Sequence, residues 1–89
     1  MPRVLVPEPY RGPTGGVGEV PVDGATIREC IEAVEARYPG FRAQVLDARG
    51  GQHRFVKLFV NGDLADPDDL DRALGSGDVI EILAAIAGG

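Results

Sequence analysis

The sequence is poor in cysteine and has no long hydrophobic run. Its single cysteine, Cys30, excludes an internal disulfide and a four-thiolate metal cluster, and it fits the reducing cytosol. No apolar stretch approaches the roughly 18 residues that a transmembrane helix needs, and the N-terminus lacks the pattern of a secretory signal peptide. We therefore expect a cytoplasmic protein with no membrane partner.

Positive charge is also scarce, because nine Lys and Arg residues face fourteen Asp and Glu residues, for a formal net charge of −5. This balance argues against nucleic acid or an anionic membrane as the main partner, and favours a partner protein with a basic groove. The 89 residues suffice for one small core, and no repeat, low-complexity block or linker divides them. We expect a single domain over residues 1–89.

The N-terminal part predicts a β-hairpin. Residues 3–6 and 17–22 are rich in valine, and the second segment places Val20 and Val22 on one side. Between them, residues 11–16 are dominated by glycine and proline, a composition typical of a loop.

A helix is predicted after the hairpin. Thr26 and Glu29 form a capping box, in which each side chain satisfies a free backbone N–H. The helix carries one apolar stripe at helical spacing, formed by Ile27, Ile31, Val34 and Tyr38. Pro39-Gly40 ends it. Cys30 falls at the edge of the stripe, and we interpret it as a small, half-buried core residue.

The strongest strand signal covers residues 54–60 and is closed by Asn61-Gly62, a pair that favours a tight turn. The preceding residues, 41–52, predict a compact connector with one helical turn through 41–46. In one register of the strand, the core-facing residues are Val56, Leu58 and Val60. The outer face then carries Phe55, Lys57 and Phe59.

The segment from Asp66 to Leu70 resembles a helix start, with an N-cap aspartate and a proline at the first helical position. Leu70 and Leu74 would point inward. A calcium site is disfavoured because the spacing of a calcium loop, with its glycine and terminal glutamate, is absent. Residues 75–78 predict a turn, and residues 79–83 a last strand with Ile80 and Ile82 inward.

The last strand leads directly into a tail of small residues that ends in Gly-Gly. Glycine has no Cβ, so two in a row let the chain lie extended in a narrow slot and leave the terminal carbonyl open to attack. We predict that the Gly89 carboxylate is the reactive group. The exposed tail that presents it comprises Ala84, Ala85, Ile86, Ala87 and Gly88. The alternative is that Gly-Gly occurs by chance.

The predicted order is hairpin, helix, strand, short strand or helical turn, and final strand. One helix that covers one face of a small mixed sheet buries both apolar surfaces with few connections. We expect an α+β fold with a mixed sheet of four to five strands and one main helix packed on one face.

Five sequence features support a resemblance to a known family: Val4-x-Val6, Thr14-Gly15-Gly16, Val60-Asn61-Gly62, Gly77 to Leu83, and the ending Ala87-Gly88-Gly89. Together they resemble the MoaD/ThiS family of ubiquitin-like sulfur carriers, over essentially the whole chain. Within it, residues 53–56, the Thr-Gly-Gly loop and the Ala-Gly-Gly end are most similar to the CysO type. The resemblance implies the β-grasp (ubiquitin-like) fold. Many members have a proline near Ala84 or Ala85 that stiffens the tail, and this sequence lacks it.

The resemblance also implies a mechanism in which partners perform the chemistry. An E1-like enzyme would adenylate Gly89 with ATP, and a persulfide sulfur would convert it to a thiocarboxylate. The thiocarboxylate would then donate sulfur, most simply to a PLP-dependent enzyme of the cysteine synthase type, and a zinc-dependent protease is a further possible partner. This chain, a monomer when free, would bind no cofactor or metal and contribute no catalytic residue.

Other functions share the same exposed tail. The sulfur could serve molybdopterin, thiamin, tRNA or a secondary metabolite. The chain could instead be a ubiquitin-like modifier joined to lysines, or a non-catalytic interaction domain with an incidental Gly-Gly.

One surface is predicted to bind the partners. Phe55 and Phe59 on the outer face around Lys57, beside Leu83, would form an apolar docking patch next to the tail. The alternative is that one or both aromatic residues close the core beneath the connector.

Overall fold

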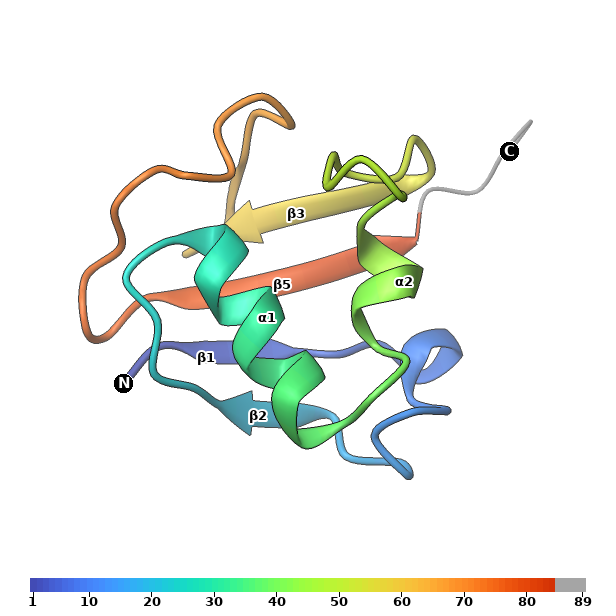
Figure 1. Cartoon of the computed structure of the whole chain (residues 1–89). Coiled ribbons are helices and arrows are strands. Elements are labelled where there is room, and N and C mark those ends of the chain that lie inside the picture. The colour runs from blue at the N-terminus through green and yellow to red at the C-terminus, as the bar shows by residue number, and fades with distance from the viewer. Residues whose placement is uncertain (85–89) are drawn as a thin grey trace.

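Five strands form one mixed sheet, and two α-helices lie on one of its faces (Figure 1). The coordinates are a computed structural model that describes residues 1–84. The elements in chain order are β1 (Arg3–Leu5), the 3₁₀ helix η1 (Glu8–Tyr10), β2 (Glu19–Pro21), α1 (Ile27–Arg37), α2 (Arg42–Val45), β3 (Val56–Val60), β4 (Asp63–Leu64) and β5 (Val79–Ala84).

The strand order is β2-β1-β5-β3-β4, so the last strand occupies the centre of the sheet. β5 runs parallel to β1, with Val4 opposite Ile80, and antiparallel to β3, with Leu58 opposite Ile82. The outer pairs, β1 with β2 and β3 with β4, are antiparallel. The expected mixed sheet is therefore confirmed, and it has five strands.

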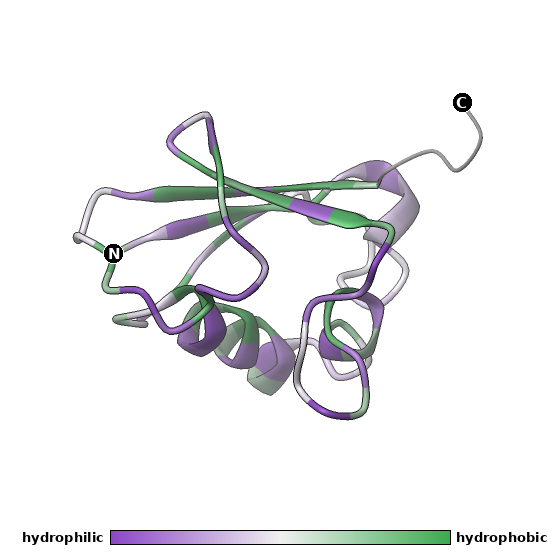
Figure 2. Cartoon of the chain, turned by 90° about the horizontal axis from the view of Figure 1, so that it is seen from above, coloured by the Kyte–Doolittle hydropathy of each residue, from purple (hydrophilic) through white to green (hydrophobic). Residues whose placement is uncertain are grey.

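The core lies between the sheet and α1. Alternate residues of β3 and β5 point toward the helix, and the predicted inward sets are all buried: Val56, Leu58, Val60, Ile80 and Ile82. The helix contributes Ile27, Ile31 and Val34 to the same core. Seen from above, the helix layer turns its hydrophobic residues toward the strands (Figure 2).

Phe41, in the connector between α1 and α2, is the largest fully buried side chain. Phe41 follows Pro39-Gly40 and is the N-cap residue of α2, and its side chain is buried in the core. The connector thus closes the core with its own aromatic residue.

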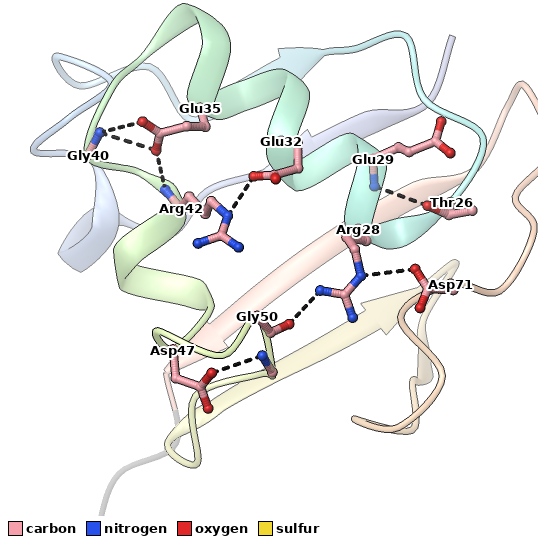
Figure 3. Close-up of polar contacts among 11 residues, drawn as sticks. Thr26, Arg28, Glu29, Glu32, Glu35, Gly40, Arg42, Asp47, Gly50 and Asp71 are labelled. Carbon is pink, nitrogen blue, oxygen red and sulfur yellow. Dashed lines mark hydrogen bonds and ion pairs between the residues drawn. The ribbon is translucent and has the colours of Figure 1, made fainter.

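Thr26 caps the start of α1, as the sequence predicts. Its Oγ1 accepts a hydrogen bond from the Glu29 N–H at 3.0 Å (Figure 3). The Glu29 carboxylate accepts from the N–H of Ala25 at 3.1 Å, one residue earlier than a standard capping box. At the other end, the Glu35 carboxylate accepts from the N–H groups of Gly40 and Arg42.

Arg28 joins α1 to two long loops (Figure 3). Its Nε donates to Asp71 Oδ1 at 2.9 Å, and its Nη1 donates to the carbonyl of Gly50. The Arg28 N–H donates to the carbonyl of Leu70. One residue therefore fixes both loops against the helix layer.

Three expectations about strand ends and burial require correction. The strand expected over 54–60 begins at Val56, because residues 54 and 55 form a turn in which the Val56 N–H donates to the His53 carbonyl. β5 runs one residue beyond Leu83, so Ala84 belongs to the strand and not to the tail. Cys30, expected to be half-buried, is fully buried.

The helix expected at residues 66–70 is absent, and a turn takes its place. Asp66 Oδ1 accepts from the Asp68 N–H at 2.9 Å, so the side chain closes a turn instead of capping a helix. The end of this loop is fixed to the residues just before α1, because the Leu74 N–H donates to the Ala25 carbonyl. Leu70 is nevertheless buried, as predicted.

Asn61 ties the end of β3 to the start of β5. It adopts a left-handed conformation (φ 51°), which asparagine tolerates better than most residues. Its Nδ2 donates to Asp78 Oδ1 at 2.9 Å, and its Oδ1 accepts from the Val79 N–H at 3.0 Å. Asp78 also accepts from the Gly75 N–H. This clamp explains why Asn-Gly and Gly-Asp occur at these two positions.

The carboxyl group of Asp78 should make the free energy of unfolding depend on pH in the acidic range. The hydrogen bond from Asn61, and then that from Gly75, lower the pKa of this carboxyl below its ordinary value of 3.8. The folded-state pKa is below the unfolded-state value. The contribution of the ionised Asp78 to the free energy of unfolding is therefore fully present above about pH 4, and it is lost as the pH falls through the folded-state pKa. We expect Asp78→Asn to be less stable than wild type at neutral pH and to lose less stability on acidification, measured by urea unfolding across that range. Asp63→Asn, which alters an exposed carboxylate of β4, is the control, and an unchanged pH profile in Asp78→Asn would contradict the assignment.

Candidate functional site

The predicted docking patch is defined as Phe55, Lys57, Phe59 and Leu83. The outer face of β3 and β5 carries Lys57, Phe59 and Leu83, whereas Phe55 lies in the turn just before β3. Lys57 lies directly opposite Leu83. Phe59, the next residue of β3 on the same face, lies opposite Glu81. Because residues opposite each other in a sheet share a face, these side chains lie on the side away from the helices. The structure thus brings the strand residues of the patch together.

The exposure of the patch differs between its members. Phe55 is 50% exposed and Leu83 is 41% exposed, whereas Phe59 is half-buried. Arg54 lies over the Phe55 ring, 5.2 Å from its centroid, within the range of a cation–π contact. Neither aromatic residue belongs to the buried core, whose aromatic component beneath the connector is Phe41. The alternative in which they close the core is therefore wrong.

The apolar surface extends beyond the predicted patch. Leu64 on β4 lies opposite Phe59 and is 63% exposed, and Leu5 on β1 pairs with Glu81. Sequence reasoning missed both residues. The alternation of residues 3–6 indicates an outward Leu5, but only the strand order shows that β1 is next to β5.

A hollow of about 270 Å³ adjoins the patch where β1 and β5 end, next to Leu83. It is lined by Leu5, Val6, Pro7, Arg11, Gly18, Glu81, Ile82 and Leu83. Arg11 is held there because its Nε donates to the Val6 carbonyl at 2.8 Å. Its guanidinium occupies the space above Gly18, where an added Cβ would approach it to 2.4 Å. A side chain at position 18 would therefore displace the Arg11 guanidinium.

The Thr14-Gly15-Gly16 loop has a structural role. Thr14 is buried, and its hydroxyl donates to the Val17 carbonyl at 2.8 Å. Gly15 and Gly16 have positive φ angles of 64° and 96°, which side chains rarely allow. The loop therefore shapes the segment that carries Arg11 to the end of β1.

The residue from which the predicted tail continues, Ala84, is held in the sheet. Ala84 is the last residue of β5 and pairs with Val56. The remaining tail residues Ala85, Ile86, Ala87 and Gly88, together with Gly89, lie outside the described residues. The docking patch is thus immediately adjacent to the strand end from which they continue.

Other titratable groups do not form a second site within residues 1–84. Burial, and then the neighbouring Glu29 and Asp23, raise the pKa of the Cys30 thiol to about 11, so the thiol is neutral at physiological pH. His53 Nε2 is 3.0 Å from the Ala43 carbonyl, a hydrogen-bonding distance. In this part of the chain no group of three or more His, Cys, Asp or Glu side chains is arranged to hold a metal ion, and no helix is long and apolar enough to cross a membrane.

A larger hollow, about 460 Å³, lies at the opposite end of the sheet. It lies between the N-terminal Met1-Pro2, residues 23–25 and residues 74–76. None of the predicted site residues lines it, and the parallel pairing of β1 with β5 places it at the start of β5, away from Ala84. We therefore centre the candidate site on the docking patch and its adjoining hollow.

Comparison with known proteins gives consistent results. The sequence matches the ThiS family over residues 4–89. It is 37% identical to the sulfur carrier protein CysO of Mycobacterium tuberculosis, in an alignment that covers 97% of this chain and 96% of that protein.

Solved structures show the same fold. A chain in the crystal structure of the Amycolatopsis orientalis BexX/CysO complex has a TM-score of 0.90 and 34% identity, with 100% of both chains covered. Mycobacterium tuberculosis CysO has a TM-score of 0.89 and 32% identity, with 97% of this chain and 100% of that chain covered. SAMP1 from Haloferax volcanii is similar in fold alone, with a TM-score of 0.76 at 22% identity over 99% of this chain and 98% of that one. The expected β-grasp fold is confirmed.

The two faces of β3 should respond differently to truncation. We expect Leu58→Ala, on the buried face, to lower the free energy of unfolding by about 2–5 kcal/mol. Phe55→Ala, at an exposed position with one cation–π contact, should lower it by less than about 1 kcal/mol. Urea unfolding of both variants provides the measurement. A loss for Phe55→Ala as large as that for Leu58→Ala would show that the aromatic ring supports the core.

Proposed function

The chain belongs to the ThiS family and is related over almost its whole length to sulfur carrier proteins of the CysO type, and from this we propose that it carries sulfur on Gly89. The relationship to CysO is the observation on which the proposal chiefly depends. The Gly88-Gly89 pair, separated from the end of β5 by three residues in the sequence, suits this role chemically, because glycine leaves the acyl carbon open to attack.

Activation of Gly89 would proceed in two stages on partner enzymes. An E1-like enzyme transfers AMP from ATP to the carboxylate, which replaces a poor leaving group by a good one. A persulfide sulfur then attacks the acyl carbon, and AMP leaves to give an acyl disulfide. A thiol of the partner enzyme attacks the S–S bond, forms a disulfide and releases the thiocarboxylate. Its sulfur is anionic and nucleophilic in the same way as a thiolate.

This chain would supply binding and presentation, and no catalytic group. Ala84 pairs with Val56 of β3, so the end of β5 is held beside the docking patch. Phe55, Phe59 and Leu83 offer the aromatic and aliphatic anchors that protein interfaces favour. The rest of the surface is acidic overall, which complements a basic groove on a partner.

For the destination of the sulfur we propose cysteine biosynthesis, through a PLP-dependent enzyme of the cysteine synthase type. The relatives named CysO support this choice. A similar chain occurs in a complex with a protein called BexX, so we propose that this chain also forms a complex with a partner protein. Delivery to another pathway, or attachment to lysines as a modifier, is the competing outcome.

The state of Gly89 in the cell distinguishes these functions. We expect the protein purified from its native cell to show an intact mass raised by the replacement of one oxygen by sulfur, located at Gly89 by fragmentation. Removal of Gly89 should abolish this species without affecting the fold, since the deletion lies beyond β5. Recovery of the chain only as lysine-linked adducts would identify a modifier instead.

The docking patch should contribute to activation more than to folding. We expect Phe59→Ala to reduce the specificity constant for adenylation by about tenfold or more, the effect of losing a typical interface anchor. Pyrophosphate exchange with the activating enzyme measures the rate, and urea unfolding measures the fold. Arg37→Ala, on the exposed side of α1, is the control and should leave adenylation unchanged. Unaltered kinetics in a folded Phe59→Ala protein would exclude the patch as the docking surface.

A further inference from the structure

The sequence contains a single lysine, Lys57, and its other eight basic residues, His53 apart, are arginines. The arginine guanidinium remains protonated at neutral pH and does not act as a nucleophile, whereas a lysine amine does when it loses its proton. The Cys30 thiol is fully buried within the core. Among side chains, Lys57 is therefore the one amine that an activated acyl group on this protein could meet.

Lys57 is accessible for such an encounter. Its side chain is exposed on the outer face of β3. The ion pairs within residues 1–84 join Arg3 to Glu19, Arg28 to Asp71 and Arg42 to Glu32, and none involves Lys57.

Lys57 also lies beside the strand that leads to Gly89. It is directly opposite Leu83, one residue before the end of β5 at Ala84. Gly89 is the fifth residue after Ala84, and five residues of chain span at most roughly 18 Å. A short tether of this kind produces effective concentrations in the millimolar range, above those of a free partner in dilute solution.

We propose that Lys57 Nζ is the internal acceptor of the activated Gly89 acyl group when the docking patch is uncovered. The neutral amine attacks the acyl carbon, an N–C amide bond forms, and the bond from the acyl carbon to its leaving group breaks. The leaving group, AMP or a thiol, departs with the electron pair, and the proton from Nζ passes to water. The product is a lactam within one chain. The inference rests on the proposed activation of Gly89.

The same placement gives docking a second role. A partner that binds Phe59 and Leu83 also covers Lys57, because the three residues occupy adjacent pairs on one face. Docking would therefore shield the acyl group from the chain's own amine while activation proceeds.

The test uses the full chain carrying a Gly89 thioester, prepared by thiol cleavage of an intein fusion. This route needs no activating enzyme, so the result is independent of whether adenylation occurs. After incubation at mildly alkaline pH, intact mass and peptide fragmentation identify the products. We expect loss of the thiol with an amide between Lys57 and Gly89, and at least a tenfold slower amide formation in Lys57→Arg, which keeps the charge.

The dependence of the rate of amide formation on protein concentration shows whether the acyl group comes from the same chain or from a second copy. A rate independent of protein concentration assigns it to the same chain, and a second-order rate with a dimeric product assigns it to a second copy. The first outcome supports Lys57 as the internal acceptor, and the second would overturn the proposal.

A relocated lysine tests whether position matters. Arg72 is exposed in the loop that precedes β5, and it contributes to the electrostatic environment of Asp78 at the start of that strand. We expect the double variant Lys57→Arg/Arg72→Lys to remain as slow as Lys57→Arg. Equal rates in wild type and Lys57→Arg, amide formation only at the Met1 amine, or full recovery in the double variant would each overturn the proposal.

Discussion

The antiparallel pairing of β3 with β5 is the constraint on which the rest of the molecule depends. Side chains alternate between the two faces of a sheet, so the register that buries Leu58 and Ile82 also directs Lys57 and Leu83 outward. A shift of β3 by one residue would exchange the two faces of this strand and place Lys57 and Phe59 on the core side. The core and the docking patch are therefore two consequences of one pairing, and neither can change alone.

The helix layer leaves the opposite face of the sheet free. α1 and α2 cover one side, and Arg28, Glu35 and Arg42 fasten the loops to that same side through their hydrogen bonds and ion pair (Figure 3). Polar contacts on the helix side of the domain stabilise the connections without crossing the outer face. The outer face can then carry exposed apolar residues beside the strand end, an arrangement typical of surfaces that bind other proteins.

The reactive side chains are distributed in accordance with this role. Cys30 is buried among aliphatic residues with its pKa raised, so it is protected from reaction. Most basic positions hold arginine, which provides charge without nucleophilicity. The one lysine lies within the docking patch, so an interface there would govern its access to any activated group. These features concern the chain's own chemistry and are separate from the chemistry of its partners.

The sequence alone determined the periodic features of this protein. Alternation identified the inward residues of β3 and β5, helical spacing identified the stripe of α1, and Thr26 marked the start of that helix, because each of these patterns is local. The tertiary structure decided the rest. Whether Asp66 would cap a helix or close a turn depended on backbone partners far along the chain, and the burial of Cys30 depended on how α1 settled on the sheet. The neighbours of Lys57 and the hollow around Arg11 followed only from the strand order, since residues distant in sequence become adjacent when β1, β5 and β3 pair.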